Sequence, residues 1–191
     1  MSQLKINFHY YLKVQKLYYI CIMKLDEAKN KFIQQWGSLG SKWGINRTMA
    51  QIHALFLITQ EPLSAEEVME ALQISRGNAN MNIRTLIDWG LVYKEYKIGE
   101  RKEFFTGEKD IWKVAQRVIK IRQRTELDPI MHALVELQHV ESTAKDKDDV
   151  AYFTDQIKNI KSLAELADKS LTTISNSNES WFLRTFMKLF K

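Results

Sequence analysis

The stretch that decides the fold runs from residue 63 to residue 92 and reads LSAEEVMEALQISRGNANMNIRTLIDWGLV. Within it, Ser64 is followed three residues later by Glu67, which is the spacing of a capping box at the start of a helix. Apolar residues then recur at helical spacing, so we expect a short helix over residues 65–72.

A second helix is expected directly after a short turn. Ser75 can cap it and Gly90 is well placed to stop it, which predicts a helix over residues 75–89. Two short helices joined by a tight turn match the helix-turn-helix pattern. The second helix is rich in glycine and asparagine, which are poor helix formers, so we infer that its outer face touches something other than water.

The residues after the second helix favour a β-hairpin. Residues 91–97 and 101–106 are β-prone, and residues 98–100 between them can turn. A helix-turn-helix followed by a basic hairpin predicts a winged helix, here with a wing over residues 91–106. Outside this region we expect helices over 25–36, 49–60, 109–127, 130–140, 150–171 and 181–191, with Thr48 as the cap of the second of these. Residues 37–48 are expected to form a loop or a broken helix end, and residues 172–180 a loop.

The composition agrees with a mostly α fold that carries a small β-hairpin wing. Only two prolines and seven glycines occur in 191 residues, which disfavours an all-β sandwich. The single cysteine, Cys21, excludes an internal disulfide framework and indicates a cytoplasmic protein. We find no stretch that is apolar for long enough to span a membrane, and no nucleotide-binding motif or catalytic constellation. We therefore expect no membrane partner, no cofactor and no enzymatic activity.

Charge divides the chain into parts. Residues 23–125 hold 17 basic and 12 acidic residues, a net charge of +5, whereas residues 126–169 hold 5 basic and 10 acidic residues, a net charge of −5. We predict a DNA-binding domain over 23–107 and a helical dimerisation and effector region over 108–191. Residues 1–22 are expected to be a tail, which either precedes the true start of the protein or is a loosely held extension.

The outer face of the predicted helix 75–89 is unusual for a surface that meets only water. Placed on a helical wheel, Ala79, Ile83, Leu86 and Ile87 face the core, and no acidic residue occurs from Ser75 to Ile87. The candidate DNA-contacting residues of this helix are Ser75, Arg76, Gly77, Asn78, Asn80, Met81, Arg84 and Thr85.

These residue types suit a DNA major groove. Asparagine can donate and accept hydrogen bonds at an adenine edge, and arginine can bind guanine or a phosphate. Met81 is apolar and can lie against a thymine methyl group, while Gly77 lets the helix N-terminus approach a phosphate. The alternative is a polar helix whose asparagines only cap and solvate it.

The wing supplies positive charge. Between residues 91 and 102 four basic residues stand against two acidic ones, a net charge of +2 that can reach phosphates or a minor groove. A plain solvated hairpin is the alternative for the wing itself. For the whole protein, the rival function is a winged-helix protein-interaction module without sequence-specific DNA binding, which would tolerate acids on these surfaces. The candidate DNA-contacting residues of the wing are Lys94, Lys97, Gly99, Arg101 and Lys102.

The chain resembles the GbsR branch of the MarR-type winged-helix regulators. The text that carries the resemblance is EPLSAEEVMEALQISRGNANMNIRTLIDWGLVYKEYKIGERKEFF, residues 61–105, and WGSLGSKWGINRTMAQIHALF, residues 36–56, looks like the entry segment of that family. The resemblance implies a bacterial or archaeal repressor that binds double-stranded DNA as a homodimer. The two copies are expected to pair through helices outside the winged helix. It also implies modulation by a small-molecule effector in some members.

Some members of that family respond to choline-type compounds, whose recognition needs an aromatic cage. Trp36, Trp43, Trp89 and Trp112 are candidates by residue type, but their spacing forms no motif and tryptophans are usually core residues, so the ligand is not carried over.

Two further features are weaker. His132, Glu136 and His139 can share a helix face with Asp128 one turn earlier, but the spacing matches no established ligand pattern and we predict no metal. The C-terminal segment, residues 181–191, is amphipathic and basic. It can lie on an anionic membrane or pack in a dimer, and we expect dimer packing because the segment is short.

Overall fold

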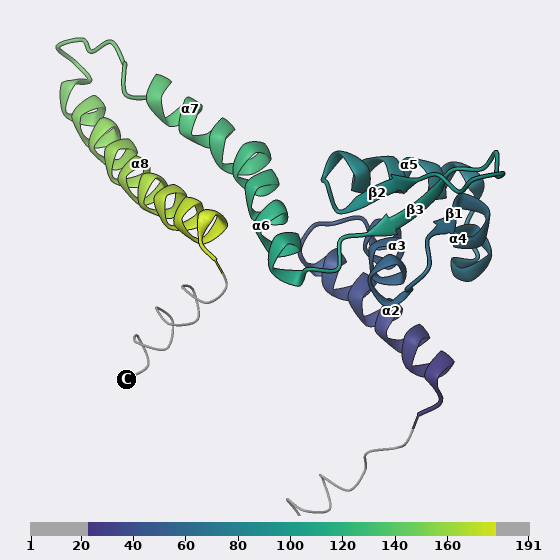
Figure 1. Cartoon of the computed structure of the whole chain (residues 1–191). Coiled ribbons are helices and arrows are strands. Elements are labelled where there is room, and N and C mark those ends of the chain that lie inside the picture. Colours follow the sequence, from purple (N-terminus) through teal and green to yellow (C-terminus); the bar gives the residue numbers. More distant parts are fainter. Residues whose placement is uncertain (1–22, 179–191) are drawn as a thin grey trace, which may run out of the picture.

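The computed structural model describes residues 23–178, and Figure 1 shows two parts. The winged-helix part contains α2 (Leu25–Lys42), α3 (Arg47–Ile58), β1 (Leu63–Ser64), α4 (Ala65–Leu72), α5 (Arg76–Asp88), β2 (Val92–Glu95) and β3 (Phe104–Gly107). The second part, here called the arm, contains α6 (Ile111–Arg122), the π-helical turn η1 (Gln123–Leu127), α7 (Asp128–Glu136) and α8 (Lys147–Asn176). The predicted fold class, mostly helical with a small wing, is confirmed.

The capping box at the start of α4 forms as predicted. The Ser64 hydroxyl accepts a hydrogen bond from the backbone N–H of Glu67 at 3.3 Å, and the Glu67 carboxylate accepts one from the backbone N–H of Ser64 at 2.7 Å. These backbone and side-chain bonds from Ser64 hold the pKa of Glu67 below its usual value. Both ends of α4 lie where the sequence predicts them, and Gln73 then turns the chain with a φ of 53°.

Helix α5 also begins and ends on the predicted signals. The Ser75 hydroxyl accepts from the backbone N–H of Asn78 at 3.4 Å, and α5 closes at Asp88. Gly90 adopts a left-handed conformation with a φ of +69°, which other residues rarely adopt. The chain therefore leaves α5 in a tight turn and enters β2 at once.

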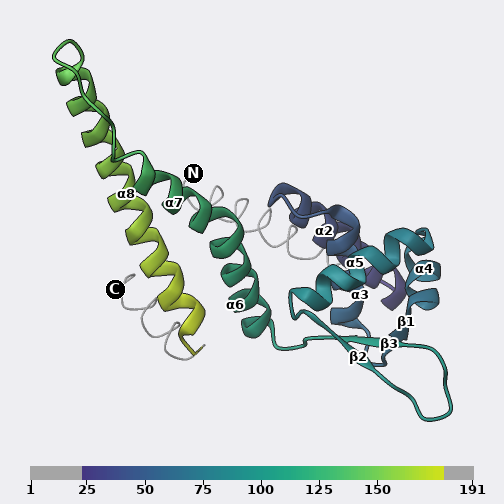
Figure 2. The ribbon, with the colours of Figure 1, turned by 90° about the horizontal axis from the view of Figure 1, so that it is seen from above.

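The wing belongs to a three-stranded antiparallel sheet with the order β1–β3–β2. Val92 pairs with Gly107, and Glu95 pairs with Phe104, so the strands end at that pair. Residues 96–103 form a longer loop than the predicted turn, because all of them are exposed and no burial favours a strand there. Figure 2 shows this loop extending beyond the ends of β2 and β3.

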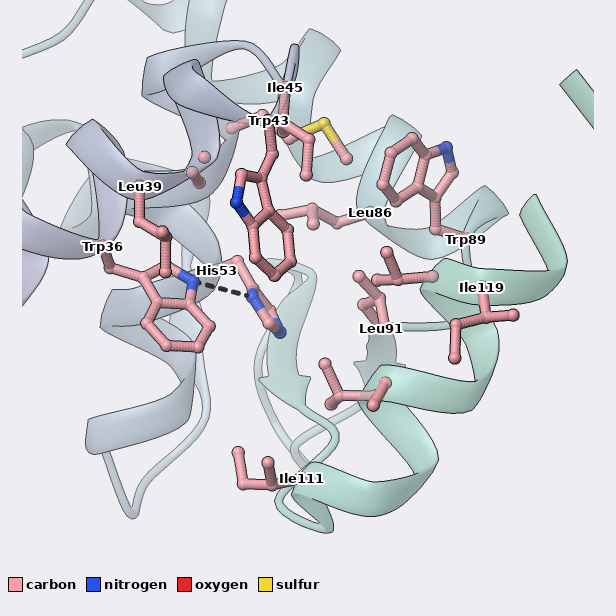
Figure 3. Close-up of a pocket in the computed structure, with 16 residues that line it drawn as sticks. Trp36, Leu39, Trp43, Ile45, His53, Leu86, Trp89, Leu91, Ile111 and Ile119 are labelled. Atoms are coloured by element: carbon pink, nitrogen blue, oxygen red, sulfur yellow. Dashed lines mark hydrogen bonds between the residues drawn. The ribbon is translucent and has the colours of Figure 1, made fainter. Parts of the chain in front are cut away.

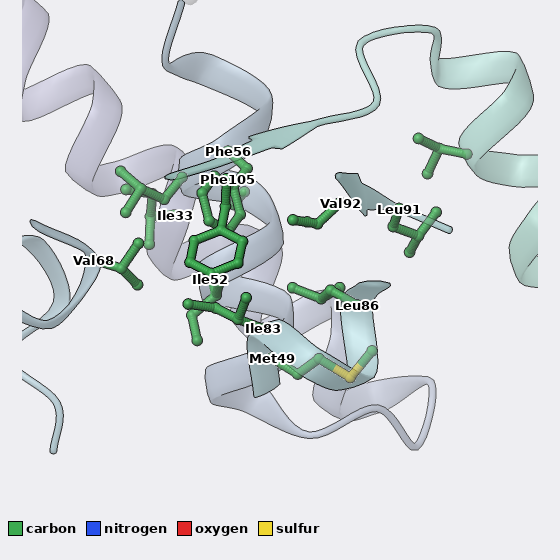
Figure 4. Packing of buried hydrophobic residues seen from close by; sticks show 13 residues of the cluster. Ile33, Met49, Ile52, Phe56, Val68, Ile83, Leu86, Leu91, Val92 and Phe105 are labelled. Carbon is green, nitrogen blue, oxygen red and sulfur yellow. The ribbon is translucent and has the colours of Figure 1, made fainter. Parts of the chain in front are cut away.

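The core of the winged helix lies between α3, α5 and the sheet (Figure 4). Its buried side chains come from α2, α3, α4, α5, β2 and β3. Tertiary packing, rather than the helix propensity of its own residues, therefore holds α5 in place. The largest fully buried side chains are Phe56, Ile52, Ile83, Leu86, Val68 and Val92.

Of the two interpretations of residues 37–48, a loop or a broken helix end, the loop is wrong as far as Lys42, because α2 continues unbroken to that residue. Gly40 is buried against α3, where an added Cβ would lie 2.6 Å from the Cβ of Ala50. The glycine therefore permits close helix packing instead of breaking the helix. The cap of α3 is Asn46 and not Thr48, since Asn46 Oδ1 accepts from the backbone N–H of Met49 at 3.1 Å.

The arm is more continuous than the sequence indicates. The sequence predicts separate helices over 109–127 and 130–140, but α6, η1 and α7 run on as one rod (Figure 1). A proline ring clashes with the carbonyl of the residue four positions earlier, and the π-helical turn before Pro129 accommodates that clash.

Helix α8 runs back along this rod and reaches Asn176, so the predicted loop over residues 172–180 is helical as far as that residue. Hydrogen bonds from α6 and η1 hold this end: Gln116 Nε2 donates to the Ser177 carbonyl at 2.7 Å, and Gln123 Nε2 donates to Thr172 Oγ1 at 3.0 Å. The predictions for residues 1–22 and 181–191 lie outside the described residues. Within residues 23–178, no helix is both long and apolar enough to cross a membrane.

Candidate nucleic-acid interface

The outer face of α5 is exposed over the residues that the sequence singles out. Ala79, Ile83 and Leu86 are buried as predicted, while the Met81 side chain is 58% exposed. Of the eight predicted residues, Ser75, Arg76, Gly77, Met81 and Arg84 are exposed, and Asn78, Asn80 and Thr85 are half-buried.

Asn82 has a structural role in α5 that the sequence analysis missed. It is 3% exposed, and its Nδ2 donates to the Asn78 carbonyl oxygen at 2.8 Å and to Asn78 Oδ1 at 2.6 Å. The side-chain oxygen of Asn78 is therefore held from within the helix, so Asn78 is less free than Asn80 to pair with an adenine edge. The four-residue spacing of the two asparagines was the available signal.

Several predicted contacts also have roles inside the protein. Thr85 Oγ1 donates to the Met81 carbonyl at 3.0 Å, and Ser75 caps the helix. Arg76 forms an ion pair with Glu66 of α4 at 3.5 Å. Arg84, in contrast, forms no ion pair with any residue that the structure describes, so its guanidinium is available to a ligand.

The wing cations fall into two groups. Lys94 forms an ion pair with Glu103 at 2.8 Å, and this bond raises the pKa of Lys94. Lys97 lies over the Phe104 ring, 4.2 Å from its centroid. Arg101 and Lys102 are exposed and have no ion pair within residues 23–178, while Gly99 makes the turn between the two groups with a φ of +85°.

One side chain of the arm contacts both α5 and the wing. Arg117 of α6 donates to the Gly90 carbonyl and, at 2.6 Å, to the Tyr93 hydroxyl, and it forms an ion pair with Glu108 at 3.3 Å. Among the basic residues of α6 and η1, Lys113, Lys120 and Arg124 are exposed, whereas Arg117 is half-buried. This residue ties the end of α5 to the arm.

Three of the four tryptophans proposed for a cage come together. Trp36, Trp43 and Trp89 line one cavity of about 390 Å³ (Figure 3). Trp112 does not line it; its indole N–H donates to the Ser177 carbonyl at 3.1 Å. As for metal ligands, no group of three His, Cys, Asp or Glu side chains gathers as a binding site among residues 23–178.

Comparison with known proteins agrees with this geometry. A model of the MarR family matches residues 43–97. The HTH-type transcriptional repressor GbsR of Bacillus subtilis (strain 168) is 24% identical over 114 residues, which cover 60% of this chain and 63% of GbsR. YvaV of the same organism is 20% identical over 88 residues, which cover 46% of this chain and 50% of YvaV. The chain thus spans less than two thirds of the length of these relatives.

A solved structure, described as that of a transcriptional regulator, shares the fold. It has a TM-score of 0.51 and 18% sequence identity, and the match covers 78% of this chain and 99% of the other. The matched family model spans α3, β1, α4, α5 and β2, and so includes the helix pair α4 and α5 and the first strand of the wing. The winged helix-turn-helix of this chain is thus similar to the MarR family over residues 43–97.

Proposed function

We propose that this protein is a sequence-specific DNA-binding transcriptional regulator. Helix α5, over residues 75–89, reads the major groove, and the wing, over residues 91–106, contacts the backbone or the minor groove. One observation carries the proposal: α5 presents exposed Arg84 and Met81 and half-buried Asn80 on a face that carries no acid from Ser75 to Ile87, with exposed Asp88 only at its end. The MarR-type fold and the name of GbsR support it.

The two groups of contacts have different tasks. Among the described residues, Arg84 forms no ion pair and the side chain of Asn80 makes no hydrogen bond. Both side chains can therefore bind base edges. Arg101 and Lys102 are exposed cations on the wing loop, where they neutralise phosphates without reading sequence.

The same proposal includes a homodimer that acts as a repressor. GbsR carries the word repressor in its name. The arm exposes large apolar side chains along α8, including Leu163 at 68% and Leu166 at 62%, and a second copy would cover them. Two copies of α5 would then enter successive major grooves of a roughly palindromic site, about one helical turn apart.

A protein-interaction module remains the rival. Its helix pair and wing would contact a protein partner, and its affinity for DNA would be low on every sequence. The charges argue against it, because no acid occurs on α5 from Ser75 to Ile87 and because two wing cations have no ion pair within the described chain.

Binding measurements with four alanine variants test this assignment. We expect Arg84→Ala and Asn80→Ala to lose about 1–3 kcal/mol on a specific site and to relax preference at particular base pairs. Arg101→Ala and Lys102→Ala should weaken binding on all sequences and each lower the salt slope by about 1.

Lys145→Ala is the matched control, since Lys145 is an exposed cation on the connection between α7 and α8, far from α5 in the chain. It should leave both the affinity and the salt slope unchanged. Equal losses on every sequence for all four interface variants would contradict the division between base reading and phosphate contact.

A further inference from the structure

The loop of the wing ends in a tight turn whose outer corner is an isoleucine. The backbone N–H of Glu100 donates to the Lys97 carbonyl at 3.1 Å, which closes a four-residue β-turn over residues 97–100. Gly99, the third residue of this turn, has a φ of +85°, whereas the φ of Ile98, the second residue, is not positive. This combination is the pattern of a type II turn, in which the second and third residues form the corner.

Ile98 is an unusual residue for that corner. Its side chain is 106% exposed, the highest value among the large apolar side chains of residues 23–178, and Tyr96 nearby is 78% exposed. The second position of a type II turn favours proline, and turns in general favour small or polar residues. The turn itself therefore does not call for a β-branched apolar side chain. Coverage by a partner would remove this apolar surface from water, which is favourable.

The turn presents Ile98 in a defined place, away from the rest of the protein. Lys97, directly before it, lies over the Phe104 ring at 4.2 Å from the ring centroid, which holds that side of the loop to β3. A Cβ built on Gly99, directly after it, would meet no atom of the protein within 4 Å beyond its chain neighbours. Figure 2 shows the loop projecting past the strands that carry it. The tip is therefore free to enter a partner.

The charges beside the tip indicate a polyanionic partner. Arg101 and Lys102 are exposed and form no ion pair among the described residues. Glu100, the acid of the turn, lines a small hollow beside α4 together with Lys97 and Lys102, which offset its charge. Proteins that bind the DNA minor groove often combine such cations with an apolar wedge, for which isoleucine is a suitable side chain.

We propose that Ile98 inserts between two base pairs from the minor groove and selects sites by how easily that base step opens. Pyrimidine–purine steps such as TA unstack easily, whereas A-tracts are stiff. The wing then favours a TA step at a fixed distance from the bases that α5 reads. An arginine in the minor groove would favour the opposite, because A-tracts have a narrow groove with an enhanced negative potential. The inference rests on the proposed function, since it requires that the wing lies on DNA.

Two DNA duplexes of equal composition test this with the full chain. One carries repeated TA steps and the other an A-tract, each about three helical turns long with identical G·C ends. Both present the same acceptors in the minor groove, so there they differ in shape and stiffness rather than in base-edge pattern. The quantity compared between variants is the ratio of the low-salt affinity for the TA duplex to that for the A-tract duplex. Because α5 is the same in all variants, any preference of that helix cancels.

Ile98→Ala should lower this ratio about three- to tenfold, because the wedge is lost. Its fold should be unaffected, since the side chain is fully exposed. Ile98→Leu keeps an apolar wedge and should keep the ratio within about twofold of the wild-type value. Arg101→Ala should weaken binding to both duplexes and leave the ratio unchanged. Ile130→Ala is the matched control, because it truncates an isoleucine of α7 that is 53% exposed, and it should change neither affinity.

Bending of the DNA separates insertion from contact at the surface. With dyes at the two ends of the TA duplex, saturating wild-type protein should raise the energy transfer between them, since inserted apolar side chains kink DNA by about 20–90°. Ile98→Ala should raise it less. An unchanged affinity ratio or an unchanged energy transfer in Ile98→Ala would overturn the inference, and DNA binding by the wild-type protein would leave the proposed function standing. Binding of neither duplex by the wild-type protein at low salt would contradict the proposed function, and this inference with it.

Discussion

The buried amide of Asn82 offers a sharp test of how α5 is built. Its Nδ2 makes two hydrogen bonds, at 2.8 Å and 2.6 Å, to the backbone and side-chain oxygens of Asn78. Each is worth about 0.5–1.5 kcal/mol net, so Asn82→Ala should lose about 1–3 kcal/mol. Alanine returns up to about 0.7 kcal/mol through its higher helix propensity. With that full return, the expected net loss in the free energy of unfolding is about 0.3–2.3 kcal/mol.

Asn80→Ala is the matched control. It gains the same helix propensity, and the Asn80 side chain makes no hydrogen bond with any described residue that the substitution could remove. Urea unfolding of both variants gives the comparison, read as a change in midpoint at constant m. We expect Asn82→Ala to be about 1–3 kcal/mol less stable than Asn80→Ala. A difference below about 0.5 kcal/mol would refute the view that Asn82 organises the helix from within.

Three further changes are predicted. Ser64→Ala should cost about 0.5–2 kcal/mol of unfolding free energy, since it removes the hydroxyl half of the capping box with Glu67; an unchanged urea midpoint would contradict this. Because burial lowers the pKa of His53 from 6.5 to about 4, stability should fall by about 1.4 kcal/mol per pH unit as the pH drops from 6.5 to about 4 and should level off below that; His53→Phe should flatten that part of the stability profile. Replacing both Leu163 and Leu166 with Glu should turn a dimer into a monomer in sedimentation, and a dimer that persists would mean that α8 is not the interface.

Features that depend on nearby residues were predictable from sequence. The capping box of Ser64 and Glu67, the cap at Ser75 and the stop at Gly90 all act within a few residues, and the structure shows each of them. The core face of α5 followed from helical spacing, since Ala79 and its neighbours on that face are buried.

Features that depend on distant partners were not predictable. The strand at Leu63 exists because it pairs with Phe105, more than forty residues away in the chain. Gly40 supports a helix because α3 packs against it closely. The sequence likewise gave no reason to expect that Trp36 and Trp89 line the same cavity, because the two residues lie on different helices that only the fold brings together.

Asparagine at three alternate positions of α5 shows the same limit. Asn78, Asn80 and Asn82 are chemically identical, and only the burial of Asn82 shows that it serves the helix while Asn80 faces outward. Residue type therefore identified the candidate surface, but tertiary packing decides which of its members can reach a ligand.

The most direct test of the central claim is a selection of sequences from random duplex DNA by the full chain, beside an Asn78→Ala/Asn80→Ala/Arg84→Ala triple variant. We predict that the wild-type protein enriches a roughly palindromic sequence and that the variant does not, although it still binds DNA at low salt through the wing. Enrichment of no sequence by the wild-type protein, with equal low-salt binding by both, would contradict sequence reading by α5. The absence of any DNA binding by either would favour the protein-interaction module.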